Sequence, residues 1–335
     1  MKYLITGATG FLGQHLAQYL KTAGHEVTVL GRNKLKIEQL AAQGFSAHSC
    51  DLDNKDELIM LTKGMDCVIH CAALSDAWGK YQTFYDTNFV GTKNIQEACL
   101  ANNIDKLIFT STPSVYVASF DRLGIKETDP FGNEYINHYA ETKKMAEKYL
   151  QENIGQKQTI FILRPQGIIG AGDTAIRPRI KKLFDKGYFI LIKNKKTYID
   201  LTYVDNVVHA ISLCLDAKSN LSCNSYNISN GQPVECEEQF KILIQGLGIE
   251  CRPKQMSAKF LLRLAEVLDR GYSFLKISKE PLITRYSART LVFSRTLDIS
   301  KAQNELGYKP KVDIHEGLKR YIHWWKAENK KEEGL

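Results

Sequence analysis

The residues best suited to chemistry in this sequence are a tyrosine and a lysine four positions apart, Tyr139 and Lys143. On a helix, this spacing puts both side chains on one face. A phenol exchanges its proton readily only if its pKa falls well below about 10, and a nearby ammonium group favours that change. Upstream, Thr112 or Ser111 follows an apolar run and could hold a substrate oxygen. The pattern predicts proton transfer coupled to hydride transfer between a secondary alcohol and a ketone.

Hydride transfer needs a carrier, and the first twenty residues predict where one binds. An apolar run at 2–5 leads into a turn with glycines at 7, 10 and 13, and residues 14–20 have a helical pattern. Such glycines let the backbone approach a pyrophosphate, and the helix N-terminus offers it unpaired N–H groups. The strand–turn–helix context disfavours the alternative, a tight turn without a ligand. The expected cofactor contacts here are Gly7, Thr9, Gly10, Phe11 and Leu12.

The end of the second predicted strand indicates which dinucleotide binds. NAD-selective sites usually have an acidic residue at this point, which accepts hydrogen bonds from the adenosine ribose. This chain has Gly31 followed by Arg32. An acid would repel a 2′-phosphate, whereas an arginine holds one by charge-assisted hydrogen bonds. We therefore expect NADP as the preferred cofactor; the alternative is NAD, with Arg32 stacked on adenine.

Strand-like and helical stretches alternate through the first half of the chain. Apolar runs separated by helical patterns lie at 26–30, 45–50, 67–73, 106–110 and 159–163. This alternation predicts an α/β fold, a doubly wound parallel (Rossmann) sheet over 1–170, completed by a segment near 200–228. Residues 171–325 are expected to form mainly a smaller α/β substrate-binding lobe and lid. The charged tail at 326–335 is expected to be frayed.

Ligands of a doubly wound sheet bind at the carboxyl ends of its strands. Asp51 and Leu52 follow the third predicted strand and are placed to reach the adenine ring. The small residues Ala72 and Ala73 end the fourth strand and allow a close approach of the cofactor, and Thr110 ends the fifth. These positions complete the cofactor site that the residues themselves predict.

The composition bears on disulfides, metal sites, targeting and membrane spans. The formal net charge is +8. The eight cysteines are scattered without a CxxC pair, so we expect neither disulfides nor a metal site and favour a cytoplasmic location. His70 is interpreted as a core histidine with satisfied hydrogen bonds. The first predicted strand begins at residue 2, so no signal peptide is expected. No apolar run approaches the roughly 20 residues that span a bilayer.

Two surface features have alternative interpretations. Basic residues cluster at 177–182 and 193–196, without the interleaved aromatic residues of a nucleic-acid site. A solvated face is the favoured interpretation, and a basic rim near the substrate mouth, suited to an acidic substrate or a membrane surface, is the alternative. The helix predicted over 258–276 is strongly apolar. We favour a core or lid helix there, with a peripheral membrane contact as the alternative.

Taken in order, these motifs resemble a known family. The glycine turn, the Tyr139–Lys143 spacing and the hydroxyl-rich turn at 110–115 are similar to those of the extended short-chain dehydrogenases/reductases. Further stretches resemble the 3β-hydroxysteroid dehydrogenase branch of that superfamily. They are VIHCAA at 68–73, NFVGT at 88–92, TSTPSV at 110–115, LTYVDN at 201–206 and EPLITRY at 280–286. The resemblance covers about residues 1–325.

The resemblance implies roles for single residues. Tyr139 would be the acid or base, Lys143 would tune it and bind the nicotinamide ribose, and Thr112, with Ser111 as the alternative, would orient the substrate oxygen. Residues implied to support or line the nicotinamide site are Asn88, Pro165 and Ile168. Sugar-nucleotide epimerases usually have asparagine at the position of Gly167 and tend to have arginine at that of Tyr198. Both are absent here.

We therefore expect an NAD(P)-dependent oxidoreductase that interconverts a secondary alcohol and a ketone. Its substrate would be small and hydrophobic, either steroid-like or a 3-oxo/3-hydroxyalkanoate. The alternative is a nucleotide-sugar epimerase, dehydratase or reductase, since a fold does not fix a substrate. A non-enzymatic NADP-sensing Rossmann protein is the weaker alternative, because such proteins tend to lose the tyrosine and the lysine. A homodimer is left open.

Overall fold

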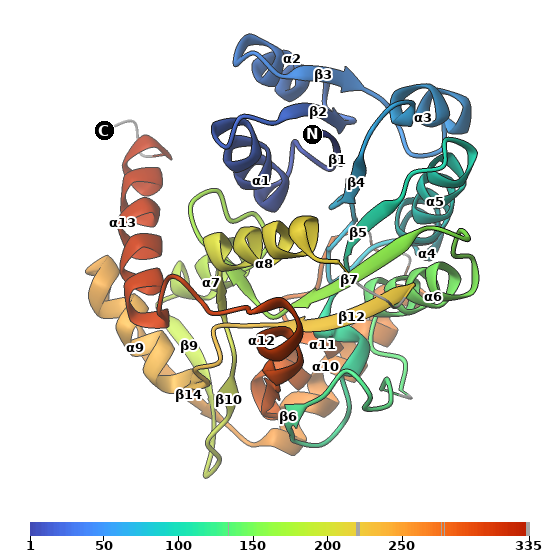
Figure 1. Cartoon of the computed structure of the whole chain (residues 1–335). Coiled ribbons are helices and arrows are strands. Elements are labelled where there is room, and N and C mark those ends of the chain that lie inside the picture. The colour runs from blue at the N-terminus through green and yellow to red at the C-terminus, as the bar shows by residue number, and fades with distance from the viewer. Residues whose placement is uncertain (133, 219–221, 276, 278, 333–335) are drawn as a thin grey trace.

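A seven-stranded parallel sheet forms the centre of the molecule (Figure 1). The structure is a computed structural model, and it describes residues 1–332 apart from 133, 219–221, 276 and 278. The strand order is β12-β7-β5-β4-β1-β2-β3, the doubly wound order with its switch point between β1 and β4. Their bounds are β1 Lys2–Thr6, β2 Glu26–Gly31, β3 Ser46–Ser49, β4 Cys67–His70, β5 Lys106–Thr110, β7 Thr159–Pro165 and β12 Cys223–Ile228.

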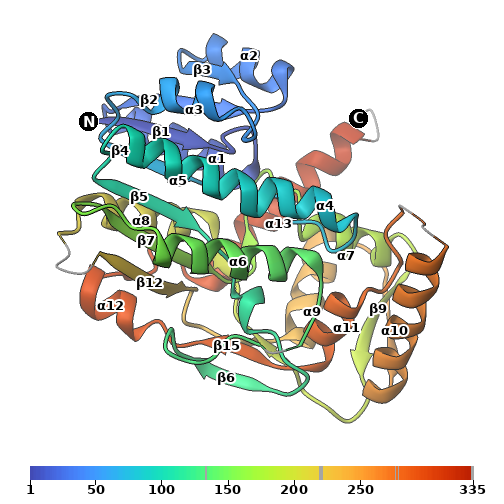
Figure 2. The same cartoon turned by 90° about the vertical axis from the view of Figure 1, so that its right-hand side faces the viewer.

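Both faces of this sheet are covered by helices, which is why its strands are apolar almost throughout. Tyr3 and Ile5 of β1 face one apolar layer and Leu4 faces the other. The first layer contains helices α1 Phe11–Thr22, α2 Lys34–Ala42 and α8 Val204–Asp216. The second, in front of the sheet in Figure 2, contains α3 Lys55–Thr62, α5 Gly91–Ala101 and α6 His138–Glu152.

A second lobe follows the carboxyl edge of the sheet. It has a four-stranded sheet in the order β13-β10-β15-β6 and a pair formed by β14 and β9. Its strands are β6 Arg122–Ile125, β9 Tyr188–Ile192, β10 Tyr198–Ile199, β13 Val234–Glu235, β14 Arg252–Met256 and β15 Arg295–Leu297. Its helices are α7 Arg177–Phe184, α9 Cys236–Leu247, α10 Ala258–Phe274 and α11 Arg285–Val292. Helix α12 Ser300–Leu306 packs instead on β12 and α8 of the central sheet. A short pair, β8 Ile168–Ile169 and β11 Thr202–Tyr203, lies between the lobes.

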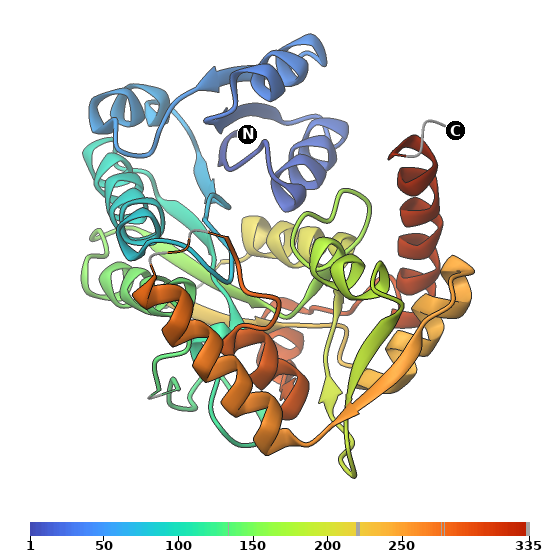
Figure 3. The ribbon, with the colours of Figure 1, turned by 180° about the vertical axis from the view of Figure 1, so that it is seen from behind.

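Helix α10, orange in Figure 3, lies on the outside of the second lobe. Leu261 and Ala265 are buried against the lobe, whereas Phe260, Val267 and Phe274 are 56–87% exposed. The helix therefore has apolar side chains on both its inner and its outer face. None of the helices that the structure describes is long and apolar enough to cross a bilayer. A peripheral contact through this helix stays a prediction.

The last helix, α13 Ile314–Glu332, corrects the expectation of a frayed tail. Its Trp325 is 1% exposed and stacks on Phe184 of α7, with ring centroids 6.2 Å apart. Near its end, Glu332 forms an ion pair with Arg177 at 2.8 Å. The expectation is therefore wrong for 326–332, because these contacts hold the charged turns in place. Residues 333–335 lie outside the described part.

A buried ion pair connects α6 to β7. The Arg164 Nε donates to Glu147 Oε1 at 3.0 Å, and both side chains are at most 2% exposed. Arg164 also donates to the Tyr116 hydroxyl, which belongs to the short helix η2 Pro113–Tyr116, and the Ser111 hydroxyl donates to Glu147. Additional hydrogen bonds of this kind are what offset the desolvation of two buried charges. The pair thus fixes α6 relative to the ends of β5 and β7.

We expect Glu147→Gln to lower the free energy of unfolding by about 3–5 kcal/mol, because it leaves the Arg164 charge buried without a counter-charge. Urea unfolding measures this loss. The matched control is Glu152→Gln in the same helix, where an exposed pair with Lys148 at 3.8 Å contributes less than about 1 kcal/mol. Equal, small effects of both substitutions would contradict the structural role of the buried pair.

Candidate active site

The turn between β1 and α1 has the geometry of a phosphate cradle. Gly7 has φ +70°, and a Cβ there would lie 2.6 Å from the backbone nitrogen of Ala72. A Cβ on Gly13 would lie 2.3 Å from the Gly7 carbonyl oxygen, so only glycine permits this packing. No side chain caps the N-terminus of α1 at Phe11. A cofactor diphosphate fits here, because the open N–H groups and the positive end of the helix dipole face the turn.

The residues predicted to hold the adenosine lie at the ends of β2 and β3. A Cβ on Gly31 would lie 2.5 Å from the Thr9 side chain, so the end of β2 lies directly against the glycine-rich turn. Arg32 follows and is exposed, as is Asp51, whereas Leu52 is buried. An exposed guanidinium beside the turn is compatible with a 2′-phosphate contact.

Helix α6, which carries the predicted catalytic residues Tyr139 and Lys143, is set in place by its first residues. The Asn137 side-chain oxygen accepts a hydrogen bond from the backbone N–H of Ala140 at 2.8 Å and caps the helix. This cap places Tyr139 in the first turn, with Lys143 and Glu147 following at intervals of four on the same face. One face of α6 therefore carries the phenol, the amine and the carboxylate of the buried ion pair.

The two hydroxyl candidates after β5 are separated by their partners. The Thr112 hydroxyl hydrogen-bonds the Tyr139 phenol. It also accepts from the backbone N–H of Ser114 and donates to the Ser114 hydroxyl, both at 3.1 Å. Ser111 instead donates to Glu147. Thr112 is thus the hydroxyl that lies beside the phenol.

The electrostatics of Tyr139 and Lys143 differ from the expectation. Burial raises the pKa of Tyr139 to about 12, although the Thr112 hydrogen bond opposes this. Burial also lowers the pKa of Lys143 to about 7. The Lys143 Nζ donates to the carbonyl oxygen of Thr110 at 2.7 Å and lies 3.8 Å from the centre of the Phe109 ring. The expected lowering of the phenol pKa by Lys143 is wrong for this structure, because the amine contacts the end of β5 instead.

Asn88 lies in a π-helical turn, η1 Tyr85–Val90, between α4 Tyr81–Phe84 and α5. Its amide nitrogen donates to the Leu74 carbonyl at 3.0 Å and to the Thr142 hydroxyl at 3.1 Å. Its amide oxygen accepts from the Leu74 N–H at 2.7 Å. Both amide hydrogens are engaged by the protein, so Asn88 positions the segment after β4 against α6 rather than reaching the cofactor.

The other predicted nicotinamide contacts share a place at the carboxyl edge of the central strands. They are Ala72 and Ala73 after β4, Thr110 at the end of β5, Pro165 at the end of β7 and Ile168 in β8.

His70 in β4 is fully buried between the hydroxyls of Thr6 at 2.6 Å and Thr92 at 3.0 Å. Burial lowers its pKa to about 3. The prediction of a core histidine with satisfied hydrogen bonds is confirmed.

The second lobe contributes a tyrosine that sequence reasoning did not identify. The Ser114 hydroxyl donates to the Tyr286 hydroxyl of α11 at 3.2 Å, and Tyr286 is close enough to Tyr139 to raise its pKa. The one available signal was the EPLITRY stretch at 280–286, which gave no role to its last residue. A side chain from another lobe, 147 positions from Tyr139, leaves no spacing pattern to follow.

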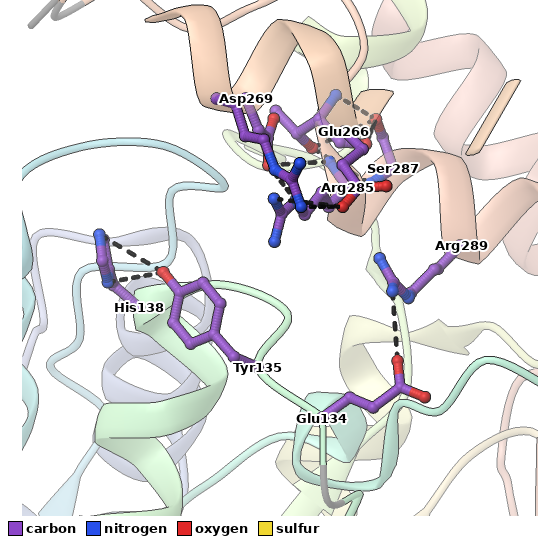
Figure 4. Close-up of polar contacts among 10 residues, drawn as sticks. Glu134, Tyr135, His138, Glu266, Asp269, Arg285, Ser287 and Arg289 are labelled. Atoms are coloured by element: carbon purple, nitrogen blue, oxygen red, sulfur yellow. Dashed lines mark hydrogen bonds and ion pairs between the residues drawn. The ribbon is translucent and has the colours of Figure 1, made fainter. Parts of the chain in front are cut away.

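Two ion pairs connect helix α11 to its neighbours (Figure 4). Arg289 pairs with Glu134, in the segment before α6, at 3.2 Å. Arg285 pairs with Asp269 of α10 at 3.6 Å. These pairs connect α11 both to the segment before α6 and to the outer helix of the second lobe. They keep Tyr286 facing the hydroxyl-rich turn.

Comparison with known proteins places the chain in a family. It matches the model of the 3-beta hydroxysteroid dehydrogenase/isomerase family over residues 4–258. It is 34% identical over 327 residues to the 2-alkyl-3-oxoalkanoate reductase of Stenotrophomonas maltophilia. The alignment covers 96% of this chain and 98% of the relative. It is 29% identical to the decarboxylating sterol-4-alpha-carboxylate 3-dehydrogenase of Mus musculus, covering 96% and 90%.

Solved structures share the fold at lower identity. The UDP-glucose 4-epimerase of Thermotoga maritima has a TM-score of 0.77 at 20% identity, covering 98% of this chain and all of that one. The UDP-glucuronic acid 4-epimerase of Bacillus cereus, solved with UDP-glucuronic acid and NAD, has a TM-score of 0.74 at 24% identity, covering 98% and 99%. These likenesses show the fold and not the substrate. The chain belongs to the 3-beta hydroxysteroid dehydrogenase/isomerase family and is an NAD(P)-dependent oxidoreductase of the extended short-chain type.

Proposed function

We propose that this protein reduces a 3-oxoalkanoate to the 3-hydroxyalkanoate, or catalyses the reverse, with NADP as its preferred cofactor. The observation that carries the proposal is the contact of Thr112 with Tyr139 at the carboxyl edge of the sheet that bears the phosphate cradle. The cofactor supplies or takes the hydride when bound. Two relatives named for 2-alkyl-3-oxoalkanoates, 34% and 32% identical over at least 94% of the chain, support this substrate class over a steroid.

Thr112 and Tyr139 would act on the substrate oxygen. In the reducing direction, both hydroxyls donate hydrogen bonds to the ketone oxygen, and the Tyr139 phenol gives its proton to that oxygen as the alcohol forms. A phenol whose pKa is raised to about 12 keeps its proton at neutral pH, which suits a donor. Lys143, four residues on, would bind the nicotinamide ribose. Because burial raises the pKa of Tyr139, the site favours ketone reduction over alcohol oxidation.

A nucleotide-sugar substrate ranks second, since only the shared fold supports it. Gly167 has φ +46°, and a Cβ there would lie 2.8 Å from the Leu201 side chain. The position where such epimerases usually present an asparagine to the diphosphate therefore has no side chain. Tyr198, at the position that tends to be arginine, is 39% exposed in β10 and offers no cation.

We expect Tyr139→Phe to lower kcat about 100-fold or more, because the phenol proton is lost.

For the intact enzyme, kcat/KM for ketone reduction should stay level from pH 6 to 9, since a phenol with a pKa of about 12 remains protonated there. The kcat/KM for alcohol oxidation should rise across the same range, because it requires the phenolate. Initial rates in both directions measure this. An oxidation rate already level at pH 7 would show that the phenol pKa is not raised.

Cofactor preference has its own test. Arg32→Ser should lower kcat/KM for NADPH by about 10–100-fold, the loss of one hydrogen bond to a charged group, and leave that for NADH within about twofold. The control is Lys63→Ser, which removes an exposed cation next to α3. A parallel loss for NADH and NADPH would assign Arg32 to adenine stacking, and a wild-type preference for NADH would overturn the NADP proposal.

A further inference from the structure

A row of hydroxyl groups leads from the catalytic tyrosine to the second lobe. The Thr112 hydroxyl, beside Tyr139, donates to Ser114 at 3.1 Å, and the Ser114 hydroxyl donates to Tyr286 at 3.2 Å. Thr112 and Ser114 are only 7% and 3% exposed. The row therefore joins the site of proton transfer to α11 through the interior of the protein.

Two arginines lie near the end of this row. Burial is the largest influence on the Tyr286 pKa and raises it, but Arg295 of β15, the Ser114 hydrogen bond and Arg179 of α7 bring it below its usual value. The charge of Arg179 also acts to lower the pKa of Tyr139, so it stabilises the ionised form of both Tyr139 and Tyr286. The Arg295 side chain hydrogen-bonds Tyr286, while its Nε is buried without a hydrogen-bond partner.

Neither of these arginines has a carboxylate partner among the residues described. Arg179 donates one hydrogen bond, to the Ser75 carbonyl at 3.2 Å. Neighbouring arginines are neutralised: Arg289 by Glu134 at 3.2 Å, as Figure 4 shows, and Arg177 by Glu332 at 2.8 Å. Partly buried cations without a counter-charge are costly. A site that keeps two of them beside a reactive phenol is suited to an anionic ligand.

Arg295 remains reachable although its Nε is buried. It is half-buried and lines a small pocket at the side of α11. Apolar side chains, among them Phe120, Ile199 and Phe293, line the same pocket.

We propose that Tyr286, Arg179 and Arg295 form an anion subsite that binds the carboxylate of the substrate and determines specificity for acids. The proposal rests on the proposed function. In a 3-oxoalkanoate, one carbon separates the carboxylate from the reacting carbonyl. With the ketone oxygen held by Thr112 and Tyr139, the acid group lies toward Tyr286. The guanidinium groups match the planar carboxylate and the phenol donates to it.

The test compares an acid with its uncharged ester. We use 3-hydroxyoctanoate and its methyl ester in the oxidation direction, since 3-hydroxy acids do not decarboxylate as 3-oxo acids do. Arg295→Met should lower kcat/KM for the acid by about 10–100-fold, the effect of one hydrogen bond to a charged group, and leave the ester within about twofold. Arg179→Met should shift the acid-to-ester ratio in the same direction and provides the test if Arg295→Met does not fold.

The matched control is Lys182→Met, also in α7, which removes an exposed cation that pairs with Glu280 at 3.4 Å. It should leave the acid-to-ester ratio unchanged. Equal losses for acid and ester in both arginine variants, or no loss in either, would overturn the subsite. If the wild type prefers the ester, the subsite is wrong and the proposed function stands. If it converts neither compound but converts a UDP-sugar, the proposed function fails and the subsite with it.

Discussion

The site depends on one buried interaction, the ion pair of Glu147 and Arg164. Glu147 comes from α6, Arg164 from β7, and Ser111 joins them from the end of β5. Because all three are sealed from water, the carboxyl ends of β5 and β7 and the face of α6 are held in one arrangement. That arrangement brings Thr112 to Tyr139. The charge pair is thus structural, yet the alignment of the Thr112 and Tyr139 hydroxyls depends on it.

Burial also sets the acid–base character of the site. The phenol keeps its proton because its surroundings disfavour the phenolate, and the Lys143 amine loses part of its affinity for a proton for the same reason. A site of this kind is better prepared to protonate a new alcohol than to deprotonate one. The positive charges that lower the phenol pKa values come from Arg179 and Arg295, which have no acidic partner in the described part of the chain, rather than from Lys143.

Local patterns predicted the parts of the protein that depend on local geometry. The glycine turn, the doubly wound parallel sheet and the candidates Thr112, Tyr139 and Lys143 follow from spacing and from strand ends. Contacts between distant segments could not be predicted. The Lys143 amine contacts β5, Tyr286 reaches the hydroxyl row from α11, and β6 forms in a stretch whose Gly, Asp and Pro content indicates a loop, because β15 pairs with it. Residues 326–332 of the charged tail are helical because α13 packs on α7 through Trp325 and Glu332.

The most direct measurement of the central claim is the fate of the transferred hydride. The enzyme is incubated with NADPH that carries deuterium at the transferable position of nicotinamide C4 and with freshly prepared 3-oxooctanoate, and the product is analysed by mass spectrometry. A hydride passed to the substrate carbonyl predicts 3-hydroxyoctanoate with one deuterium, on C3. Unlabelled hydroxy acid, or no hydroxy acid while a UDP-sugar is converted under the same conditions, would contradict the account.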